Sequence, residues 1–173
     1  VAGTGTRKHW VRAVGQWFIR TTSVAKRFPK LVLPTIGEAE KLLLLEQICQ
    51  GAWSYKEIKD RPVLPIVKSW LTAAQQQSVE KLAPERIALP NNRKAKITYH
   101  LSSPPTVAAR IQDLYGVERN LAIGQGRVPL VIQVLAPNHR PIQITSDLTT
   151  FWRDAYPKIK KELQRKYPRH EWQ

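Results

Sequence analysis

The sequence is poor in sulfur and in acidic residues, and it has no long apolar run. It contains no methionine, one cysteine, and 13 acidic residues against 28 basic ones. The lone Cys49 cannot form an internal disulfide, is typical of a reducing compartment and is expected to be buried. No apolar stretch approaches the roughly 18 residues that cross a membrane, so we expect a soluble, cytoplasmic chain with no membrane partner. Because position 1 is not methionine, we also expect the sequence to be part of a longer protein.

The residue types that catalysis and metal binding require are not grouped. The four histidines are isolated from one another, and no serine stands in a nucleophile elbow. The run Gly124-Gln125-Gly126-Arg127 lacks the spacing of a P-loop and is expected to form a tight turn. Asp147 and Asp154 are explained more simply by a helix cap and a solvated charge than by a catalytic pair. We therefore predict no catalytic residue, no metal site and no cofactor, and so no enzyme activity of this chain.

The excess of basic residues gives a formal net charge of +15 and an isoelectric point near 10.3. Such a charge attracts polyanions, and nucleic acid above all. An acidic partner domain or simple solubility would also account for it. The hydrophobic fraction of 42% is ordinary for a globular protein, so a chain that is disordered throughout is not expected.

The N-terminal half has the periodicity of helices. Apolar residues recur at helical spacing from Lys8 to Phe28. Further helices are predicted from Thr35 or Gly37 to Gly51, and from Pro65 to a point before Pro84. Residues 1–6 are small and polar, which suits a linker or a cloning remnant.

After residue 84 the pattern changes to short strands separated by turns. Residues 86–89 and 94–100 predict a hairpin, and residues 128–135 and 141–145 predict a second pair of strands. A helix is predicted after Pro104-Pro105, with its end at Gly116.

The last part of the chain is predicted to be helical. Asp147 suits a helix N-cap, with Phe151 and Trp152 packing inward, and a terminal helix is expected from about Pro157. The fold class is therefore α+β: after the linker at 1–6, a helical segment at 7–83 precedes a small mixed α/β unit at 84–173. That unit would contain the hairpins and the C-terminal helix.

Basic side chains interleaved with aromatic ones are concentrated after residue 90. Lys and Arg neutralise phosphates, and aromatic rings can stack on unpaired bases. Alternation along the predicted hairpin would place Lys94 and Lys96 on one face. For Tyr167 and Trp172, stacking on bases and packing on the core both remain open. The candidate nucleic-acid-binding residues are Arg93, Lys94, Lys96, Arg127, Arg140, Arg153, Lys158, Lys160, Lys161, Arg165, Lys166, Tyr167, Arg169 and Trp172.

Residues from about 80 to 172 also contain a series of motifs in a particular order and spacing. They are Leu82-Ala83-Pro84, Gly126-Arg127-Val128-Pro129-Leu130, Arg140-Pro141-Ile142-Gln143-Ile144-Thr145, Asp147-Leu148-Thr149-Thr150-Phe151-Trp152-Arg153, and Tyr167-Pro168-Arg169-His170-Glu171-Trp172. Together they resemble the C-terminal region of the bacterial HrpB helicases. The sequence departs from that pattern at Gln125, where the family has glycine, and at Asn91-Asn92, where a Ser-Gly turn is common.

The resemblance implies a parent protein that is an ATP-dependent DExH-type helicase with two RecA-like motor domains upstream. ATP and Mg²⁺ would be bound in those domains and not by this chain. We expect an accessory region with a basic surface for nucleic acid, single-stranded RNA above all, with little sequence specificity. The alternative is a protein-interaction or scaffold module that packs on the motor domains or docks another protein. The oligomeric state is not predicted.

Overall fold

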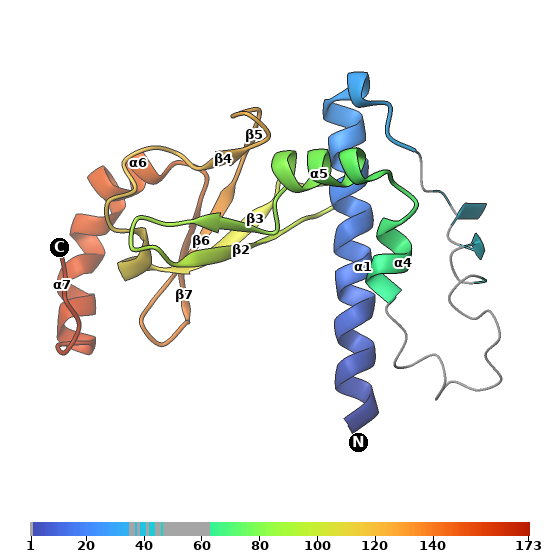
Figure 1. Cartoon of the computed structure of the whole chain (residues 1–173). Coiled ribbons are helices and arrows are strands. Elements are labelled where there is room, and N and C mark those ends of the chain that lie inside the picture. The colour runs from blue at the N-terminus through green and yellow to red at the C-terminus, as the bar shows by residue number, and fades with distance from the viewer. Residues whose placement is uncertain (1, 35–36, 38, 41, 44–45, 47–62) are drawn as a thin grey trace. The chain divides into compact units, whose positions relative to one another are not determined.

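The computed structural model describes residues 2–34, 37, 39–40, 42–43, 46 and 63–173, with side chains described from residue 12 onward. The chain divides into two compact units, Val1–Ala83 and Pro84–Gln173, which are described separately below (Figure 1). The helix predicted between Thr35 or Gly37 and Gly51 lies largely outside the described residues, and so does Cys49. The expected α+β class is confirmed, because the first unit is helical and the second contains the sheets.

The first unit is built on one long helix. Its elements are α1(Ala2–Arg27), the 3-10 helix η1(Pro29–Leu31), α4(Val63–Lys68) and α5(Ala73–Leu82). Both α4 and α5 contact α1. The buried apolar residues include Trp17 and Val24 on α1, Val67 on α4 and Val79 on α5. The long helix predicted from apolar periodicity is confirmed, and it begins at Ala2, inside the stretch that the sequence assigned to a linker.

The single helix predicted from Pro65 to Pro84 is wrong, because the chain leaves the helix after Lys68 and starts another at Ala73. The reason is a capping box. The Thr72 hydroxyl accepts a hydrogen bond from the Gln75 amide at 3.2 Å, and the Gln75 side chain accepts one from the Thr72 amide at 2.8 Å. This reciprocal pair satisfies two amides at the start of α5 and sets its first turn.

The second unit contains a five-stranded sheet and a two-stranded one. The strands are β1(Arg86–Ala88), β2(Lys94–Thr98), β3(Thr106–Arg110), β4(Ala122–Ile123), β5(Val128–Pro129), β6(Val131–Leu135) and β7(Pro141–Thr145). The large sheet has the order β1-β2-β3-β6-β7, and β4 pairs with β5. All neighbours are antiparallel except β3 and β6, which are parallel. Both predicted strand pairs, β1 with β2 and β6 with β7, are confirmed.

Two predictions for this unit are wrong in part or in whole. The helix expected from Pro104-Pro105 to Gly116 is instead β3 followed by the 3-10 helix η2(Ile111–Leu114). The strand expected over residues 128–135 is interrupted at Leu130, so that β5 joins the small sheet and β6 the large one. For β3 and β6 the deciding partner lies far along the chain, as in the register Thr106–Val131, and local sequence does not reveal it. Strand β5, by contrast, pairs with the nearby β4.

The C-terminal helical segment consists of α6(Leu148–Thr150), the π-helix η3(Phe151–Ala155) and α7(Tyr156–Lys166). The predicted cap is confirmed, because the Asp147 carboxylate accepts a hydrogen bond from the Thr150 amide at 3.0 Å. Pro157 has no amide hydrogen and would clash with an α-helical turn before it. The wider π turn immediately upstream therefore accommodates this proline within a continuous helical segment.

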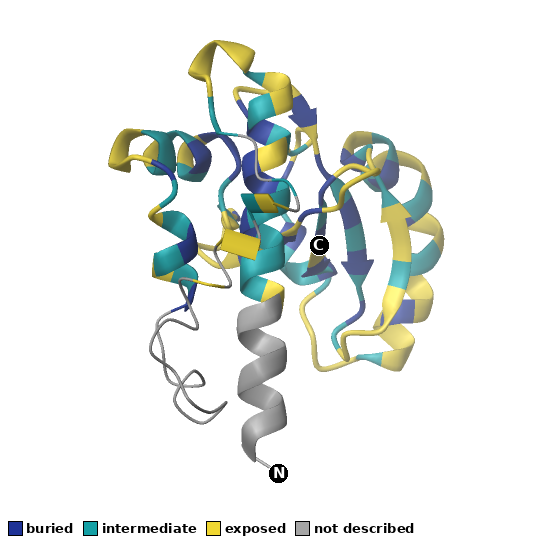
Figure 2. Cartoon of the chain, turned by 90° about the vertical axis from the view of Figure 1, so that its right-hand side faces the viewer, coloured by how far each residue is buried: buried dark blue, intermediate teal, exposed yellow. Residues whose placement is uncertain are grey.

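The large sheet has an inner and an outer face. The inner face is marked by three buried residues on adjacent strands. Ile97 of β2 pairs with Val107 of β3, and Val107 pairs in turn with Ile132 of β6. The helical segment lies on this side, because Phe151 and Ile159 line one hollow together with Thr145, the register partner of Ile132. Figure 2 shows the buried residues concentrated on the central strands. The outer face is the more exposed one.

Candidate nucleic-acid interface

Strand β2 presents two lysines on the outer face of the large sheet. Lys94 and Lys96 are exposed and alternate with the buried Ala95 and Ile97, as the sequence predicted. Arg86 on β1 is the register partner of Lys96 and is also exposed. We call Arg86, Lys94 and Lys96 the strand patch. None of the three forms an ion pair with a described residue.

Arg86 was not among the sequence candidates. In the sequence it is separated from Lys96 by a turn and stands beside Glu85, so nothing local marks it. The hairpin prediction was enough to place it on a strand. Only the register, which pairs Arg86 with Lys96 and Ala88 with Lys94, shows that it shares a face with the lysines.

Arg93 differs from the strand patch because it has an acidic neighbour. Its guanidinium Nε lies 3.9 Å from an Asp113 carboxylate oxygen, and Arg110 Nε lies 3.3 Å from the other oxygen. The Asn91 side-chain amide also donates to Asp113 at 2.8 Å. Asp113 therefore ties the β1–β2 turn to the end of β3 and offsets the charge of two arginines.

Helix α7 presents a second basic surface. Lys158, Lys161 and Arg165 stand at i, i+3 and i+7, which places them in one row along the helix. All three are exposed, whereas Tyr156 and Leu163 on the opposite side of α7 are buried. We call these three residues the helix stripe. None of them forms an ion pair among the residues that the structure describes.

The other basic candidates of the helical segment form ion pairs or a cation–π contact with neighbouring side chains. Arg153 forms two contacts with the adjacent Asp154, at 2.9 and 3.1 Å. Lys166 lies 3.5 Å from Glu162, and the Lys160 ammonium lies 5.9 Å from the centre of the Tyr156 ring.

Three further candidates are exposed arginines in turns or in the C-terminal tail. Arg127 closes the β4–β5 turn, where Gly124, Gln125 and Gly126 all have left-handed backbone with φ of 60, 59 and 80°, so the predicted tight turn is confirmed. Arg140 lies in the β6–β7 turn and donates its amide to Asn138 at 3.1 Å. Arg169 follows α7. These arginines belong to neither the strand patch nor the helix stripe.

The aromatic side chains mostly contact one another. Tyr115, Phe151, Trp152 and Tyr156 form a cluster with ring centres 5.0–6.3 Å apart. Phe151 is buried, as predicted, while Trp152 is half-buried and donates its indole N–H to the Val117 carbonyl at 3.0 Å.

Tyr167 and Trp172, the two aromatic candidates, are half-buried. The Trp172 indole donates to the Tyr167 carbonyl at 3.0 Å, and the Tyr167 ring packs edge-on against His170. No aromatic residue lies on the outer face of the described strands β1, β2 and β3.

The strand patch and the helix stripe lie on opposite sides of the second unit. The patch is on the outer face of the sheet, whereas the helical segment that leads into α7 lies over the inner face, where Lys158 of the stripe lines a hollow together with Gln143 and Thr145 of β7. The candidate residues therefore do not form one continuous surface. A nucleic acid that contacts the patch would have to pass round the edge of the unit to reach the stripe.

Asp147 and Asp154 both line a hollow of about 470 Å³ beside the π turn. Hydrogen bonds from the Thr150 side chain and amide lower the pKa of Asp147. The hydrogen bonds from Arg153 lower the pKa of Asp154, with a smaller contribution from the charge of Lys158. Both acids are thus committed to a cap and to a surface ion pair, as the sequence indicated. Among the described residues no group of three or more His, Cys, Asp and Glu could hold a metal ion.

Comparison with known proteins gives a consistent result. The family model of the HrpB C-terminal region, described as "ATP-dependent helicase C-terminal", matches residues 44–173. The ATP-dependent RNA helicase HrpB of Escherichia coli (strain K12) is 33% identical over 168 residues, which cover 95% of this chain and 21% of that protein. The resemblance read from the sequence motifs is thereby confirmed.

Two solved structures are similar to the chain over most of its length. A crystal structure of the E. coli DExH-box NTPase HrpB superimposes with a TM-score of 0.83 over 92% of the chain, and one of the Escherichia coli DEAH/RHA helicase HrpB with 0.72 over 91%. Both are 33% identical to it, and the match covers 20% of each of those chains. The sequence thus spans about a fifth of the length of its relatives. Among the described residues, no helix combines the length and apolar character that a membrane span needs.

Proposed function

This chain belongs to the family of HrpB-type ATP-dependent helicase C-terminal regions, and from that membership we propose that it is a non-catalytic accessory region that binds RNA. Its partners are single-stranded RNA and the motor domains of the parent helicase. ATP and Mg²⁺ are bound by those motor domains, which lie outside this sequence. The role of the accessory region is to hold the RNA while the motor moves it.

The observation that supports RNA binding is the presence of two groups of exposed cations that form no ion pair among the described residues, although Lys158 lies near enough to Asp154 for its charge to act on that acid. The two groups are the strand patch Arg86, Lys94 and Lys96 and the helix stripe Lys158, Lys161 and Arg165. Cations arranged in this way release counterions when they meet phosphates, which drives binding without reading sequence.

Little sequence specificity is expected from these surfaces. Sequence-specific RNA recognition uses unstacked bases that are held on aromatic rings or hydrogen-bonded along their edges. Here the most prominent aromatic residues, Tyr115, Phe151, Trp152 and Tyr156, pack on one another. The basic residues therefore carry most of the affinity.

The test is a fluorescence-anisotropy titration of the whole chain with labelled single-stranded RNA across a salt series. The logarithm of the binding constant should fall linearly with the logarithm of the salt concentration. Changing all three residues of the strand patch, or all three of the helix stripe, to Gln should flatten the slope by about 2, because each phosphate contact contributes about 0.7 for a single strand.

A matched control removes the same charge from elsewhere. Arg12, Lys81 and Arg119 are exposed and belong to neither surface, so Gln at these three positions should leave the slope unchanged. An affinity that does not depend on salt, or no binding at low salt, would contradict RNA binding. Equal losses in all three variants would show that only total charge matters.

One feature favours the alternative of an interaction module that packs on the motor domains. Ile144 on the edge strand β7 is 65% exposed, and through its register with Gln133 it shares the outer face with the half-buried Val131 and Leu135. An exposed apolar group on an edge strand is a common site of protein contact.

The alternative is tested by mixing the chain with the separately produced motor domains. Ile144→Lys should abolish a complex that depends on this apolar end of the sheet, while leaving RNA binding intact. A complex that survives this substitution would exclude the β7 edge as the contact.

A further inference from the structure

Two positive charges stand directly opposite each other on the outer face of the large sheet. Arg86 on β1 and Lys96 on β2 are antiparallel register partners, and both are exposed. Directly opposed residues have Cβ atoms about 4.5–5.5 Å apart, and like charges in that position destabilise the pair of strands. No described acidic side chain forms an ion pair with either of them.

A third cation increases the repulsion. Lys94 lies two residues from Lys96 on the same face of β2, which corresponds to a separation of about 7 Å along the strand. Its own register partner is Ala88, so it has no cross-strand carboxylate either. By contrast, Arg93 in the β1–β2 turn and Arg110 at the end of β3 share Asp113. The fold supplies an acid there and supplies none for the strand patch.

The residues around the strand patch have small side chains. Alternation along the strands places Ala88, Thr98 and Ala108 on the outer face beside the three cations, and all of them are exposed. Because these side chains are short, the guanidinium and ammonium groups project beyond them from a flat surface of the sheet. A long polyanion can lie across this surface, whereas a base finds no aromatic ring within the described strands β1, β2 and β3 to stack on.

We propose that the strand patch is a seat for the phosphodiester backbone that recognises phosphates and makes no use of the bases. This inference rests on the proposed RNA-binding function and assigns part of it to Arg86, Lys94 and Lys96. The Arg86 guanidinium can donate to two oxygens of one phosphate, and the lysines act as point charges toward the next. Bound phosphates replace the missing carboxylate and relieve the repulsion between Arg86 and Lys96.

The first test is a double-mutant cycle on stability with Arg86→Gln, Lys96→Gln and the double variant, in the whole chain without nucleic acid. Each single variant should raise the melting temperature by about 1–3 °C at low salt, because it removes a like-charge pair. The double variant should gain little beyond Lys96→Gln, which already removes the repulsion with both Arg86 and Lys94, and the differences should disappear at high salt. Single variants that melt lower than the wild type, or gains that add, would contradict the repulsion.

The second test measures what the patch recognises. In a background where the helix stripe Lys158, Lys161 and Arg165 is changed to Gln, an oligouridylate and an abasic RNA backbone of the same length are compared by anisotropy. The two should bind within about threefold of each other, because removal of a stacked base would weaken binding roughly fivefold or more. Adding Arg86→Gln and Lys96→Gln should flatten the salt slope by about 1.4 for both ligands.

The outcomes separate this inference from the proposed function. A much weaker abasic ligand would show that bases are contacted, and the inference would be wrong while RNA binding stands. If the patch variants bind RNA as the wild type does and the helix-stripe variant loses affinity, the phosphate-binding site lies on α7 and the inference is wrong. If the wild-type chain binds neither ligand at low salt, both proposals fail.

Discussion

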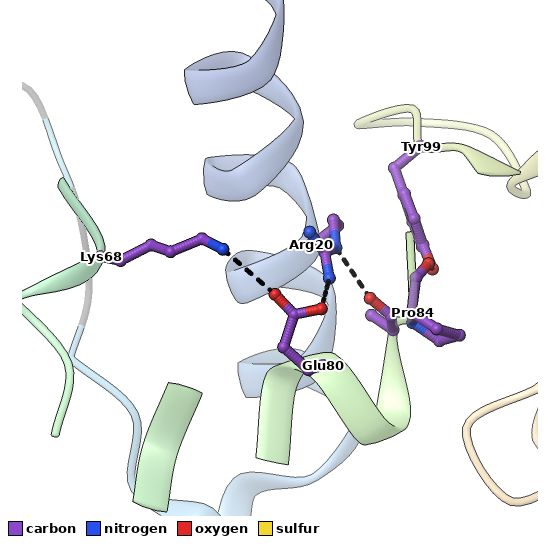
Figure 3. A network of polar contacts seen from close by, with 6 residues as sticks. Arg20, Lys68, Glu80, Pro84 and Tyr99 are labelled. Carbon is purple, nitrogen blue, oxygen red and sulfur yellow. Dashed lines mark hydrogen bonds and ion pairs between the residues drawn. The ribbon is translucent and has the colours of Figure 1, made fainter. Parts of the chain in front are cut away.

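The guanidinium of Arg20 and the carboxylate of Glu80 form an ion pair of 2.7 Å in which the arginine side chain is 5% exposed and the glutamate 42%. The same guanidinium donates through Nε to the Ala83 carbonyl at 2.7 Å. The Lys68 ammonium reaches the other Glu80 oxygen at 3.3 Å, so one carboxylate joins three helices of the first unit (Figure 3). Both cations also lie near the ring of the buried Trp17, at 5.3 and 4.8 Å from its centre.

Glu80→Gln should destabilise the first unit. Breaking a fully buried pair by removing one partner costs about 3–5 kcal/mol, and the partial exposure of Glu80 reduces this to about 1–3 kcal/mol of unfolding free energy. Lys68→Gln is the comparison, with an expected loss below about 1 kcal/mol because its contact with Glu80 is longer and its side chain is 30% exposed against 5% for Arg20. Urea denaturation of the whole chain measures both. Because Glu80→Gln breaks both contacts and Lys68→Gln only one, equal losses would show that the Arg20–Glu80 pair adds no stability.

The same carboxylate should make the first unit sensitive to acid. Burial alone would raise the pKa of Glu80, but the hydrogen bonds and charges of Arg20 and Lys68 outweigh it, and the pKa is lowered. A lowered pKa in the folded state adds stability that is complete above the unfolded value of about 4.3 and disappears as pH falls through the folded value. The stabilities of wild type and Glu80→Gln should therefore converge below about pH 4. A constant difference down to pH 2 would contradict the role of the charge.

Tyr156 should make the second unit sensitive to alkali. Burial, and then the hydrogen bond with Tyr115, raise the pKa of the Tyr156 phenol; its oxygen lies 3.0 Å from the Tyr115 oxygen and donates to the Gln173 carbonyl at 2.8 Å. Because the folded state favours the neutral phenol, stability should fall as pH rises above the unfolded pKa of about 10. Tyr156→Phe should reduce this fall and cost about 1 kcal/mol at neutral pH through the lost hydrogen bonds. Thermal melts at pH 7 and above pH 10, with tyrosine absorbance followed in parallel, give both quantities.

Val32→Gly should stabilise the first unit. Val32 ends η1 with left-handed backbone, φ 47° and ψ 55°, a conformation that is strained for a β-branched residue. Its side chain is 79% exposed, so little packing is lost on its removal. Relief of strain, partly offset by the greater freedom of glycine in the unfolded chain, should give about 1 kcal/mol. Val32→Ala should fall between the two. A glycine variant less stable than the wild type in a thermal melt would show that the strain is not significant.

Local chemistry was enough to predict much of the second unit. The turn residues at 90–93 and 137–140 and the alternation of Lys94 and Lys96 with apolar residues predicted both strand pairs. Asp147 was recognised as a cap because its side chain can satisfy a nearby amide. Signals of this kind depend on neighbours within a few residues, and the structure confirms them.

The error at residues 104–116 has a physical cause. Val107, Ala108, Ile111 and Leu114 fit a helical stripe, and Val107, Ile111 and Leu114 are indeed buried. Ala108 is exposed and Ala109 is buried in its place, which is the alternation of a strand over residues 106–110. A short apolar run is compatible with both periods. Pairing with β6 stabilises the strand over the helix, because β3 and β6 are parallel neighbours from Thr106–Val131 onward.

The sequence by itself determined the family, the net charge, the helical and strand-rich halves, and the residues that belong to short turns and caps, because all of these follow from composition or from contacts near in the chain. Only the tertiary structure decided which cations face the same way, which are occupied by an acid, and that the strand patch and the helix stripe lie on opposite sides of the second unit. Those properties depend on register and on packing between distant segments. The pairing of Arg86 with Lys96 and the sharing of Asp113 by Arg93 and Arg110 are such contacts, and no local pattern predicts them.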